Sequence, residues 1–278
     1  MQAHERITQS IRSAAQRGGA LVPFLTAGYP IRDEFVDRLR EIAPSADVIE
    51  VGVPFSDPMA DGMTIQRSSH QAIENGVTLR WILQQLSDVK ADLDTPIVLM
   101  SYLNPMLAYD LDDLARDALE AGVCGFIVPD LPFEESAPVR DALDEAGIGL
   151  IQLVTPATPP ARIATLCAES RGFVYAVTVT GITGGQTGLP AEVSDYLQRV
   201  RDVSPLPVCA GFGIRSQADV ARINACADGA LVGSASRRWW KYWSNEVTLA
   251  RLSLACEADE KGLQCRQPGD GRALSQHT

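Results

Sequence analysis

The sequence predicts an α/β fold, a (β/α)8 TIM barrel that forms one domain over residues 1–262. Eight short apolar runs recur along the chain, and a segment with helical periodicity follows nearly every one of them. The runs are continuously apolar, as expected of parallel strands that are covered on both faces. No linker rich in Pro, Gly and Ser interrupts this alternation, so a single barrel is expected. An open, doubly wound sheet is the structural alternative, because periodicity alone does not distinguish the two.

An extra helix is expected before the first strand. Ile7, Ile11 and Ala14 recur with helical spacing, and the pattern stops at Gly18-Gly19. The expected strands then follow in order at residues 20–25, 47–51, 96–100, 124–128, 149–153, 173–177, 206–210 and 229–233.

Capping signals mark helices between these strands. Asp110 precedes an amphipathic segment that Gly122 closes. Thr158 stands before Pro159, the pairing of an N-cap residue with a first-turn proline. The signals fall in the gaps between the apolar runs and so favour a strand–helix alternation.

Composition excludes several classes of function. Of the 278 residues 46% are hydrophobic, enough for a sizeable globular core. The formal net charge of −11 argues against nucleic acid as a partner, and no apolar run approaches the roughly 20 residues of a membrane span. The six cysteines form no Cys-x-x-Cys pair, and the first residues lack the apolar core of a signal peptide. A cytoplasmic protein with reduced thiols is therefore expected.

Acidic residues gather around the second expected strand, in the stretch Ile49–Gly62. Glu50 lies inside an apolar run, where an unpaired carboxylate is unfavourable. A single Glu there would favour a surface strand, but the loop that follows adds Asp57 and Asp61. Three carboxyl groups at one strand end are typical of an acid/base site, where proton affinities are shifted.

Other strands supply apolar side chains or a phenol near their ends, where a barrel of this kind places its chemistry. These residues are Phe24, Met100, Ile127, Leu153 and Tyr175. Each apolar one fits the barrel core as well as it fits a substrate wall. A buried tyrosine hydroxyl needs a hydrogen-bond partner, and Glu50 or Asp61 is expected to provide it.

Glycines mark two further loops. The seventh and eighth strands end in Ala210–Ile214 and Val232–Ala235, where backbone N–H groups free of side chains can face a phosphate. Each run alone would be an ordinary tight turn, but together at the last two strands they favour an anion site. The sixth strand is followed by Thr180–Pro190, whose glycines and threonines are typical of a closing lid or of a merely flexible loop.

The residues that are scarce limit the mechanism. Lys90 is the only lysine before position 241, and it lies in a polar segment rather than at a strand end, so a Schiff base is not expected. The three histidines are scattered through the sequence, which argues against a metal site and a Ser-His-Asp triad. No metal and no cofactor are therefore expected, and a carbon–carbon cleavage would have to proceed by proton transfer.

The motif Ile49–Gly62 resembles that of the tryptophan synthase alpha chain family, and the similarity extends from Ala20 to about Ala235. It includes Val22-Pro23-Phe24, Met100-Ser101-Tyr102-Leu103-Asn104-Pro105, Pro129-Asp130-Leu131-Pro132, Gly211-Phe212-Gly213 and Gly233-Ser234-Ala235. The resemblance implies retro-aldol cleavage of indole-3-glycerol phosphate to indole and glyceraldehyde 3-phosphate. Protonated indole is itself an electron sink, which suits a site without metal or imine.

The resemblance also assigns roles to single residues. Glu50 would deliver a proton to indole C3, and Asp61 would contact the indole N–H. Thr183 would meet Asp61 when the lid closes. The substrate wall would comprise Phe24, Met100, Ile127, Leu153, Tyr175 and Phe212. Phosphate would lie on the amides of Gly184, Gly213, Gly233 and Ser234.

A partner is implied in the same way. The family pairs with a pyridoxal-phosphate beta chain in an alpha2-beta2 heterotetramer, and the loop with Pro54 and Asp57 would reach it. Two alternatives stay open: a catalytically silent subunit that binds ligand and activates the beta chain, and a related phosphate-binding barrel such as indole-3-glycerol phosphate synthase. The second would need a catalytic lysine at a strand end, which the sequence lacks.

The family pattern breaks after Ala235. Three of the four tryptophans follow, at positions 239, 240 and 243, and they are expected to pack on the barrel as a distorted last helix. Residues 263–278 are polar, and a disordered tail is expected there.

Overall fold

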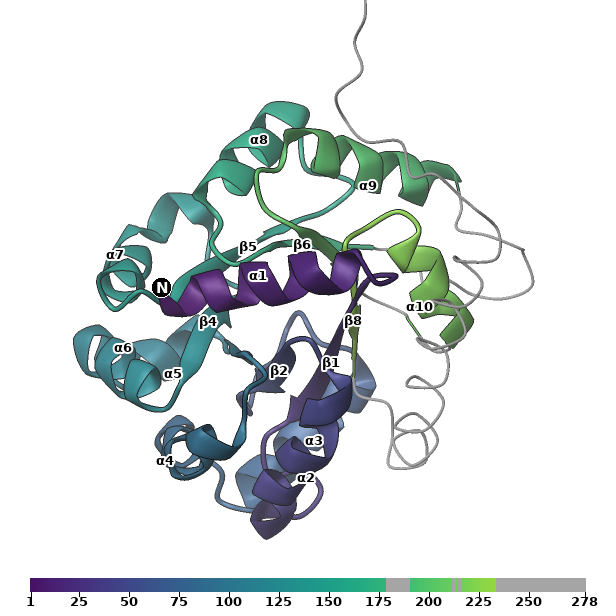
Figure 1. Cartoon of the computed structure of the whole chain (residues 1–278). Helices are drawn as coiled ribbons and strands as arrows, with labels where there is room; N and C mark the ends of the chain where they lie inside the picture. The colour runs from purple at the N-terminus through teal and green to yellow at the C-terminus, as the bar shows by residue number, and fades with distance from the viewer. Residues whose placement is uncertain (179–190, 212–213, 215–216, 234–278) are drawn as a thin grey trace, which may run out of the picture.

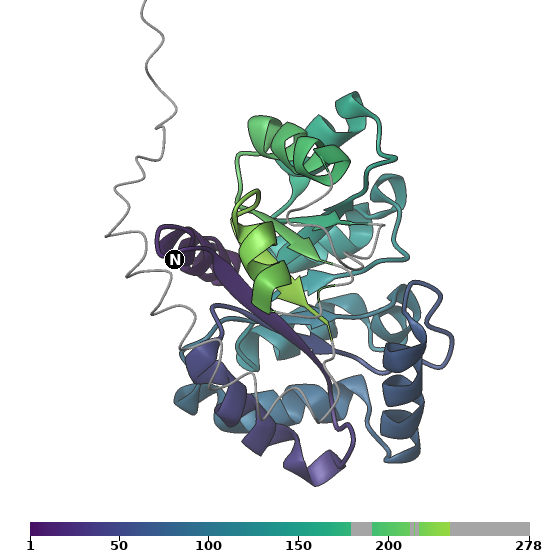
Figure 2. The ribbon, with the colours of Figure 1, turned by 90° about the vertical axis from the view of Figure 1, so that its right-hand side faces the viewer.

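The computed structural model describes residues 1–178, 191–211, 214 and 217–233. They form a closed barrel of parallel strands in sequential order, β1 to β8 (Figure 1). β1 pairs in parallel with β2 on one side and with β8 on the other, and Figure 2 shows β8 beside β1. The (β/α)8 prediction is confirmed, and the doubly wound alternative is excluded because an open sheet would leave two strand edges unpaired.

The strands are Ala20–Thr26 (β1), Ile49–Gly52 (β2), Ile97–Met100 (β3), Val123–Ile127 (β4), Gly149–Val154 (β5), Val174–Val177 (β6), Val208–Gly211 (β7) and Gly229–Val232 (β8). The α-helices of the described ranges are Ala3–Ala15 (α1), Phe35–Ile42 (α2), Met63–Glu74 (α3), Leu79–Val89 (α4), Leu103–Leu107 (α5), Leu111–Glu120 (α6), Ala137–Glu145 (α7), Pro160–Glu169 (α8), Ala191–Val203 (α9) and Gln217–Asn224 (α10). Every expected strand is present, with its ends within about two residues of the expected ones.

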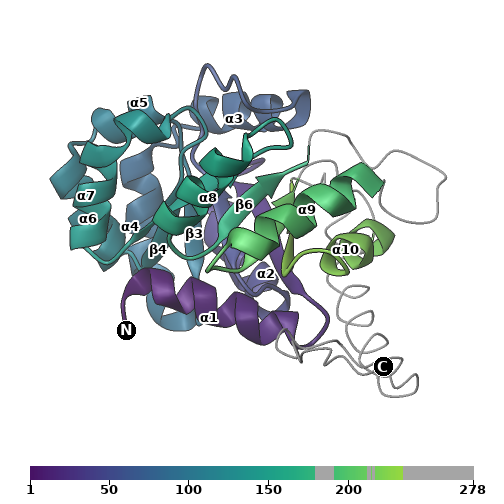
Figure 3. The ribbon, with the colours of Figure 1, turned by 90° about the horizontal axis from the view of Figure 1, so that it is seen from above.

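The extra helix α1 closes the N-terminal end of the barrel. Ile7 and Ile11 are fully buried and belong to the same apolar cluster as Val98 and Cys124 inside the barrel. The chain then turns at Gly18 and Gly19, whose φ angles of 104° and 108° favour glycine. Figure 3 shows α1 on the opposite side of the molecule from α3, which follows β2. The C-terminal strand ends are therefore the open end of the barrel.

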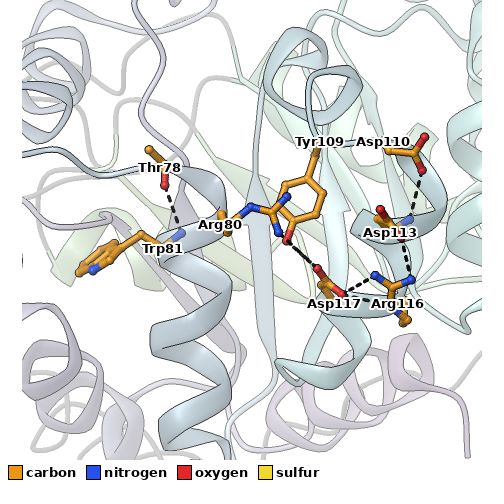
Figure 4. A network of polar contacts seen from close by, with 8 residues as sticks. All are labelled: Thr78, Arg80, Trp81, Tyr109, Asp110, Asp113, Arg116 and Asp117. Atoms are coloured by element: carbon orange, nitrogen blue, oxygen red, sulfur yellow. Dashed lines mark hydrogen bonds and ion pairs between the residues drawn. The ribbon is translucent and has the colours of Figure 1, made fainter.

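A polar network fastens the outer helices α4 and α6 (Figure 4). Asp110 caps α6 as predicted, because its side chain accepts hydrogen bonds from the N–H groups of Asp112 and Asp113. The Tyr109 hydroxyl donates to Asp117 Oδ2 at 2.6 Å, and the Arg80 guanidinium lies 4.2 Å from the Tyr109 ring centroid. The network lies at the surface and does not line the barrel mouth.

The predicted cap of α8 is wrong by one residue. The helix begins at Pro160 with Pro159 at the N-cap, and no side chain caps it. The Thr158 hydroxyl instead accepts the N–H of Thr155 at 3.0 Å. A threonine hydroxyl can close a local turn as readily as it caps a helix, and here the turn is formed.

Several expectations fall on residues 234–278, which lie outside the described residues. The tryptophan-rich last helix, the domain boundary at 262 and the tail of 263–278 therefore stay predictions. No helix in the described ranges is both long and apolar enough to cross a bilayer.

Candidate active site

Glu50 lies on β2 at the mouth of the barrel. It is in register with Phe24 of β1 and Val98 of β3, and it is 3% exposed. Its carboxyl group makes no hydrogen bond to another residue that the structure describes. Burial, and secondarily the charge of Asp61, raise the pKa of Glu50 to about 8. A carboxyl group in this state keeps its proton near neutral pH and can act as an acid.

Asp61 reaches the same mouth from the loop between β2 and α3. Gly62 is the N-cap of α3, and the Gln66 side chain holds the loop by donating to the Asp61 carbonyl at 2.9 Å. Burial raises the pKa of Asp61 to about 6, while a hydrogen bond from Tyr102 opposes the rise. Asp61 is therefore mostly ionised at neutral pH and can accept a proton or a hydrogen bond.

Tyr102 holds Asp61 in place, and the sequence analysis assigned it no role. Its hydroxyl donates to Asp61 Oδ2 at 3.2 Å and accepts the N–H of Ala60 at 2.9 Å. Its ring stacks on Phe55 with centroids 5.1 Å apart. The available signal was its position two residues beyond Met100, at the end of the third strand and near the acidic loop.

Tyr175 on β6 faces the two acids without bonding to them. Among the described residues its hydroxyl makes no hydrogen bond to Glu50 or Asp61, so the expected pairing is replaced by the bond from Tyr102. Burial raises the pKa of Tyr175, and the charges of Glu50 and Asp61 add to the rise. Gly211 leaves room for the phenol, because a Cβ at that position would lie 2.7 Å from the Tyr175 hydroxyl.

A cavity of about 700 Å³ fills the mouth, within the usual size range of ligand sites. It brings together eight of the residues expected at the site: Phe24, Glu50, Asp61, Met100, Ile127, Leu153, Tyr175 and Gly233. Ile65 of α3, Val177 and Leu231 also line it and were not expected there. The wall is largely apolar around one pair of acids, which suits a ligand with a flat apolar ring and an N–H or O–H group.

The remaining expected residues divide into two groups. Pro54 is buried and Asp57 is exposed, and neither lines the cavity. The others lie outside the described residues: Thr183, Gly184, Phe212, Gly213 and Ser234. The lid and most of the phosphate site therefore stay predictions, as do the assigned roles of the residues that the cavity brings together.

The geometry of the cavity defines a class of protein. One cavity holds a carboxylic acid that keeps its proton and a carboxylate that has lost its own, the arrangement that acid/base catalysis uses. Within the described residues, no three His, Cys, Asp or Glu side chains gather as metal ligands would. The fold and site are those of a barrel enzyme equipped for proton transfer.

Comparison with known proteins identifies the family. Residues 11–261 match the family model of the tryptophan synthase alpha chain. The tryptophan synthase alpha chain of Nitratidesulfovibrio vulgaris (strain DP4) is 46% identical over 84% of this chain and 91% of its own length. That of Bacillus cereus (strain ATCC 14579) is 42% identical over 81% and 88%. The chain therefore belongs to the tryptophan synthase alpha chain family, and it is a lyase of the indole-3-glycerol phosphate cleavage half-reaction.

Solved structures agree with this assignment. Mycobacterium tuberculosis tryptophan synthase superimposes with a TM-score of 0.79 at 36% identity, covering 90% of this chain and 97% of that chain. The alpha chain from Legionella pneumophila gives 0.78 at 31% identity, covering 95% and 100%. The family match also continues to residue 261, beyond Ala235, where the sequence analysis placed the break.

Proposed function

We propose that the chain cleaves indole-3-glycerol phosphate to indole and glyceraldehyde 3-phosphate with Glu50 and Asp61 as its catalytic residues. The observation that carries the proposal is the pair of unlike acids in one cavity, with pKa values of about 8 and about 6. Family membership supplies the reaction, and the pair supplies a donor and an acceptor of protons.

Glu50 and Asp61 can together carry out the proton transfer and charge stabilisation that the reaction needs. Glu50 donates its proton to indole C3, and Asp61 stabilises the positive charge that develops at the ring N–H. The bond between C3 and the side chain then breaks, and its electron pair returns to the indole ring. The side-chain carbon of the broken bond, which carries a hydroxyl group, becomes the aldehyde, and its O–H proton passes to the Glu50 carboxylate. Glu50 thus recovers the proton that it gave, and no other reactant is consumed.

Tyr102 is proposed as a positioning residue in this mechanism. Its hydrogen bond occupies one oxygen of Asp61 and lowers the pKa of that carboxyl group. An ionised Asp61 stabilises the cationic ring better than a neutral one. The contact therefore favours the state of Asp61 that the reaction needs.

Phosphate is proposed to bind near the ends of β7 and β8. Gly233 supports this position because it lines the cavity and a Cβ there would meet no atom of the described residues within 4 Å, which leaves its backbone open to a ligand. Gly184, Gly213 and Ser234 would complete the site through backbone N–H groups, and Thr183 and Phe212 would close over the ring.

The loop after β2 is proposed to contact a beta chain in an alpha2-beta2 assembly. Asp57 is exposed there, and the nearby Met59 and Met63 are 89% and 63% exposed. Large apolar side chains left in solvent are typical of a partner surface. Pro54 is buried and would act by shaping the loop.

A cytoplasmic location is proposed from the free thiols of Cys124, Cys167, Cys209 and Cys226.

The direct test follows indole release from indole-3-glycerol phosphate by the full chain, alone and with a tryptophan synthase beta chain. Indole formation in both samples, faster with the partner, supports the proposal. A chain that forms no indole in either sample but accelerates the beta chain would be the silent subunit instead.

A further inference from the structure

The cavity at the mouth continues into a second compartment on the outer side of β5. Side chains alternate across a strand: Ile151 and Leu153 join the apolar cluster inside the barrel, whereas Leu150 and Val154 join clusters of the helix layer. Gln152 therefore faces the helix layer, although it lines the same cavity. We call this compartment the side arm and define it by Leu131, Phe133, Gln152, Thr158, Arg162 and Leu166.

Gln152 is the feature that makes the side arm a candidate site. It is 7% exposed, and its backbone N–H donates to Ser170 Oγ at 3.0 Å. The side-chain amide has no partner among the residues that the structure describes. A buried amide without partners is unfavourable, and its free oxygen and NH2 group can both bind a ligand in the arm.

The other polar groups of the side arm are already paired. Arg162 forms an ion pair with Glu134, with Nη2 2.9 Å from Oε2. The Thr158 hydroxyl accepts the N–H of Thr155. Because these groups are satisfied and the charge of Arg162 is balanced, the side arm offers one neutral hydrogen-bonding group between apolar walls. The Phe133 ring supplies an aromatic surface.

We propose that the side arm is a second binding site, separate from the acids of the mouth, for a small neutral aromatic heterocycle whose ring N–H is bound by the Gln152 amide. Indole belongs to this class. Under the proposed function it is released in the mouth, which belongs to the same cavity as the arm. Only the choice of indole rests on the proposed function, because binding in the arm requires neither Glu50 nor Asp61.

The test uses NMR of the full chain titrated with indole, without turnover. The side-chain amide resonances of Gln152 report on the arm and are assigned by their loss in Gln152→Leu. The backbone N–H of Ala60, which lines the mouth, reports on the first site. Both sets of resonances are expected to shift in the wild-type chain, with different dissociation constants.

Two variants and one ligand separate the sites. In Gln152→Leu the weaker of two indole binding steps, followed by calorimetry, is expected to weaken by about 3- to 10-fold, the effect of one hydrogen bond, while the Ala60 response is unchanged. Leu166→Trp fills the arm and should abolish the Gln152 response only. Indene, the same ring system without an N–H, should bind in the wild-type arm as weakly as indole binds in Gln152→Leu.

The proposal is overturned if the Gln152 amide resonances do not shift even at the solubility limit of indole, beyond saturation of the Ala60 response. It is also overturned if indene matches indole in the wild-type arm, which would make the arm a non-selective apolar cavity. Cleavage assays keep the two proposals apart: a chain that binds indole in the arm but cleaves no indole-3-glycerol phosphate refutes the proposed function alone.

Discussion

The carboxyl groups at the two ends of the barrel have different hydrogen-bond partners. At the closed end, Asp47 accepts the N–H of Leu21 at 2.8 Å, and Asp228 accepts the N–H of Val208 at 2.8 Å. Arg17 and Arg201 add ion pairs to these two acids. At the open end, Glu50 is more buried than either of them, with 3% exposed, and makes no such contact with the residues that the structure describes.

The comparison shows which carboxyl groups stabilise the fold and which one destabilises it. A buried carboxylate that accepts backbone N–H groups joins neighbouring strands and favours folding. A buried carboxyl group without donors holds its proton at neutral pH, which weakens the fold but supplies an acid. The same residue type thus becomes structural or catalytic according to the donors around it.

The largest expected effect is on the rate at the open end. Glu50→Gln keeps the side-chain volume but has no proton to give to the substrate, so turnover should fall about 10²- to 10⁴-fold. Indole release under saturating substrate measures it. Binding of indole itself should change by no more than a few-fold, because Gln preserves the shape of the cavity. A variant that kept more than about a tenth of wild-type turnover would remove Glu50 from the role of acid.

The same substitution should stabilise the fold. The pKa of Glu50 rises from 4.5 to about 8 on folding, so its contribution to stability is full below pH 4.5 and is lost progressively up to about pH 8. Glu50→Gln does not titrate and escapes this loss. The free energy of unfolding of the variant should equal that of the wild type at pH 4 and exceed it by roughly 3 kcal/mol at pH 7. Urea denaturation of both proteins across this pH range measures the difference. A difference that does not change with pH would mean that Glu50 ionises normally.

At the closed end the opposite result is expected. Asp47→Ala leaves the buried Leu21 N–H without its acceptor and should lower the free energy of unfolding by about 1–3 kcal/mol. The contribution of Arg17 is small because its side chain is 66% exposed. Asp47→Asn, which keeps an acceptor oxygen, is the matched control and should lose less. Cleavage by the folded protein should stay within two-fold of wild type in both variants; a loss comparable to that of Glu50→Gln would refute the division between the two ends.

Much of the fold was readable from the sequence. Parallel strands buried on both faces produce continuous apolar runs, and the runs from 20–25 to 229–233 all became strands. Glycine stops and the Asp110 cap marked helix ends because a positive φ and unpaired N–H groups each favour few residue types. Thr158 failed as a cap because its hydroxyl has two local uses of similar energy.

The site was less readable. Glu50 and Asp61 stood out because acids in an apolar context are unusual, and the cavity brings both to the mouth. The hydrogen bond of Tyr102 to Asp61 was missed because it depends on how the loop folds back over β3, which periodicity does not encode. Gln152 was missed because a single amide in a strand gives no sign of whether its partners exist.

The smallest expected effect concerns the contact between Tyr102 and Asp61. Tyr102→Phe removes the hydrogen bond that lowers the pKa of Asp61 and leaves desolvation unopposed, so the pKa should rise above about 6. Because the proposed reaction needs ionised Asp61 and protonated Glu50, activity should rise through pH 6 and fall through pH 8. In the variant only the acidic limb of the profile should move, toward higher pH.

Tyr109→Phe is the matched control, since it removes a phenol–carboxylate bond of 2.6 Å to Asp117 (Figure 4), and neither residue lines the cavity. It should leave both limbs in place, and a merely structural role for Tyr102 would lower activity at every pH without moving either limb. If the acidic limb of Tyr102→Phe stays where it is in the wild type, Tyr102 does not set the protonation of Asp61. The pKa of Asp61 would then be set mainly by burial, as that of Glu50 is.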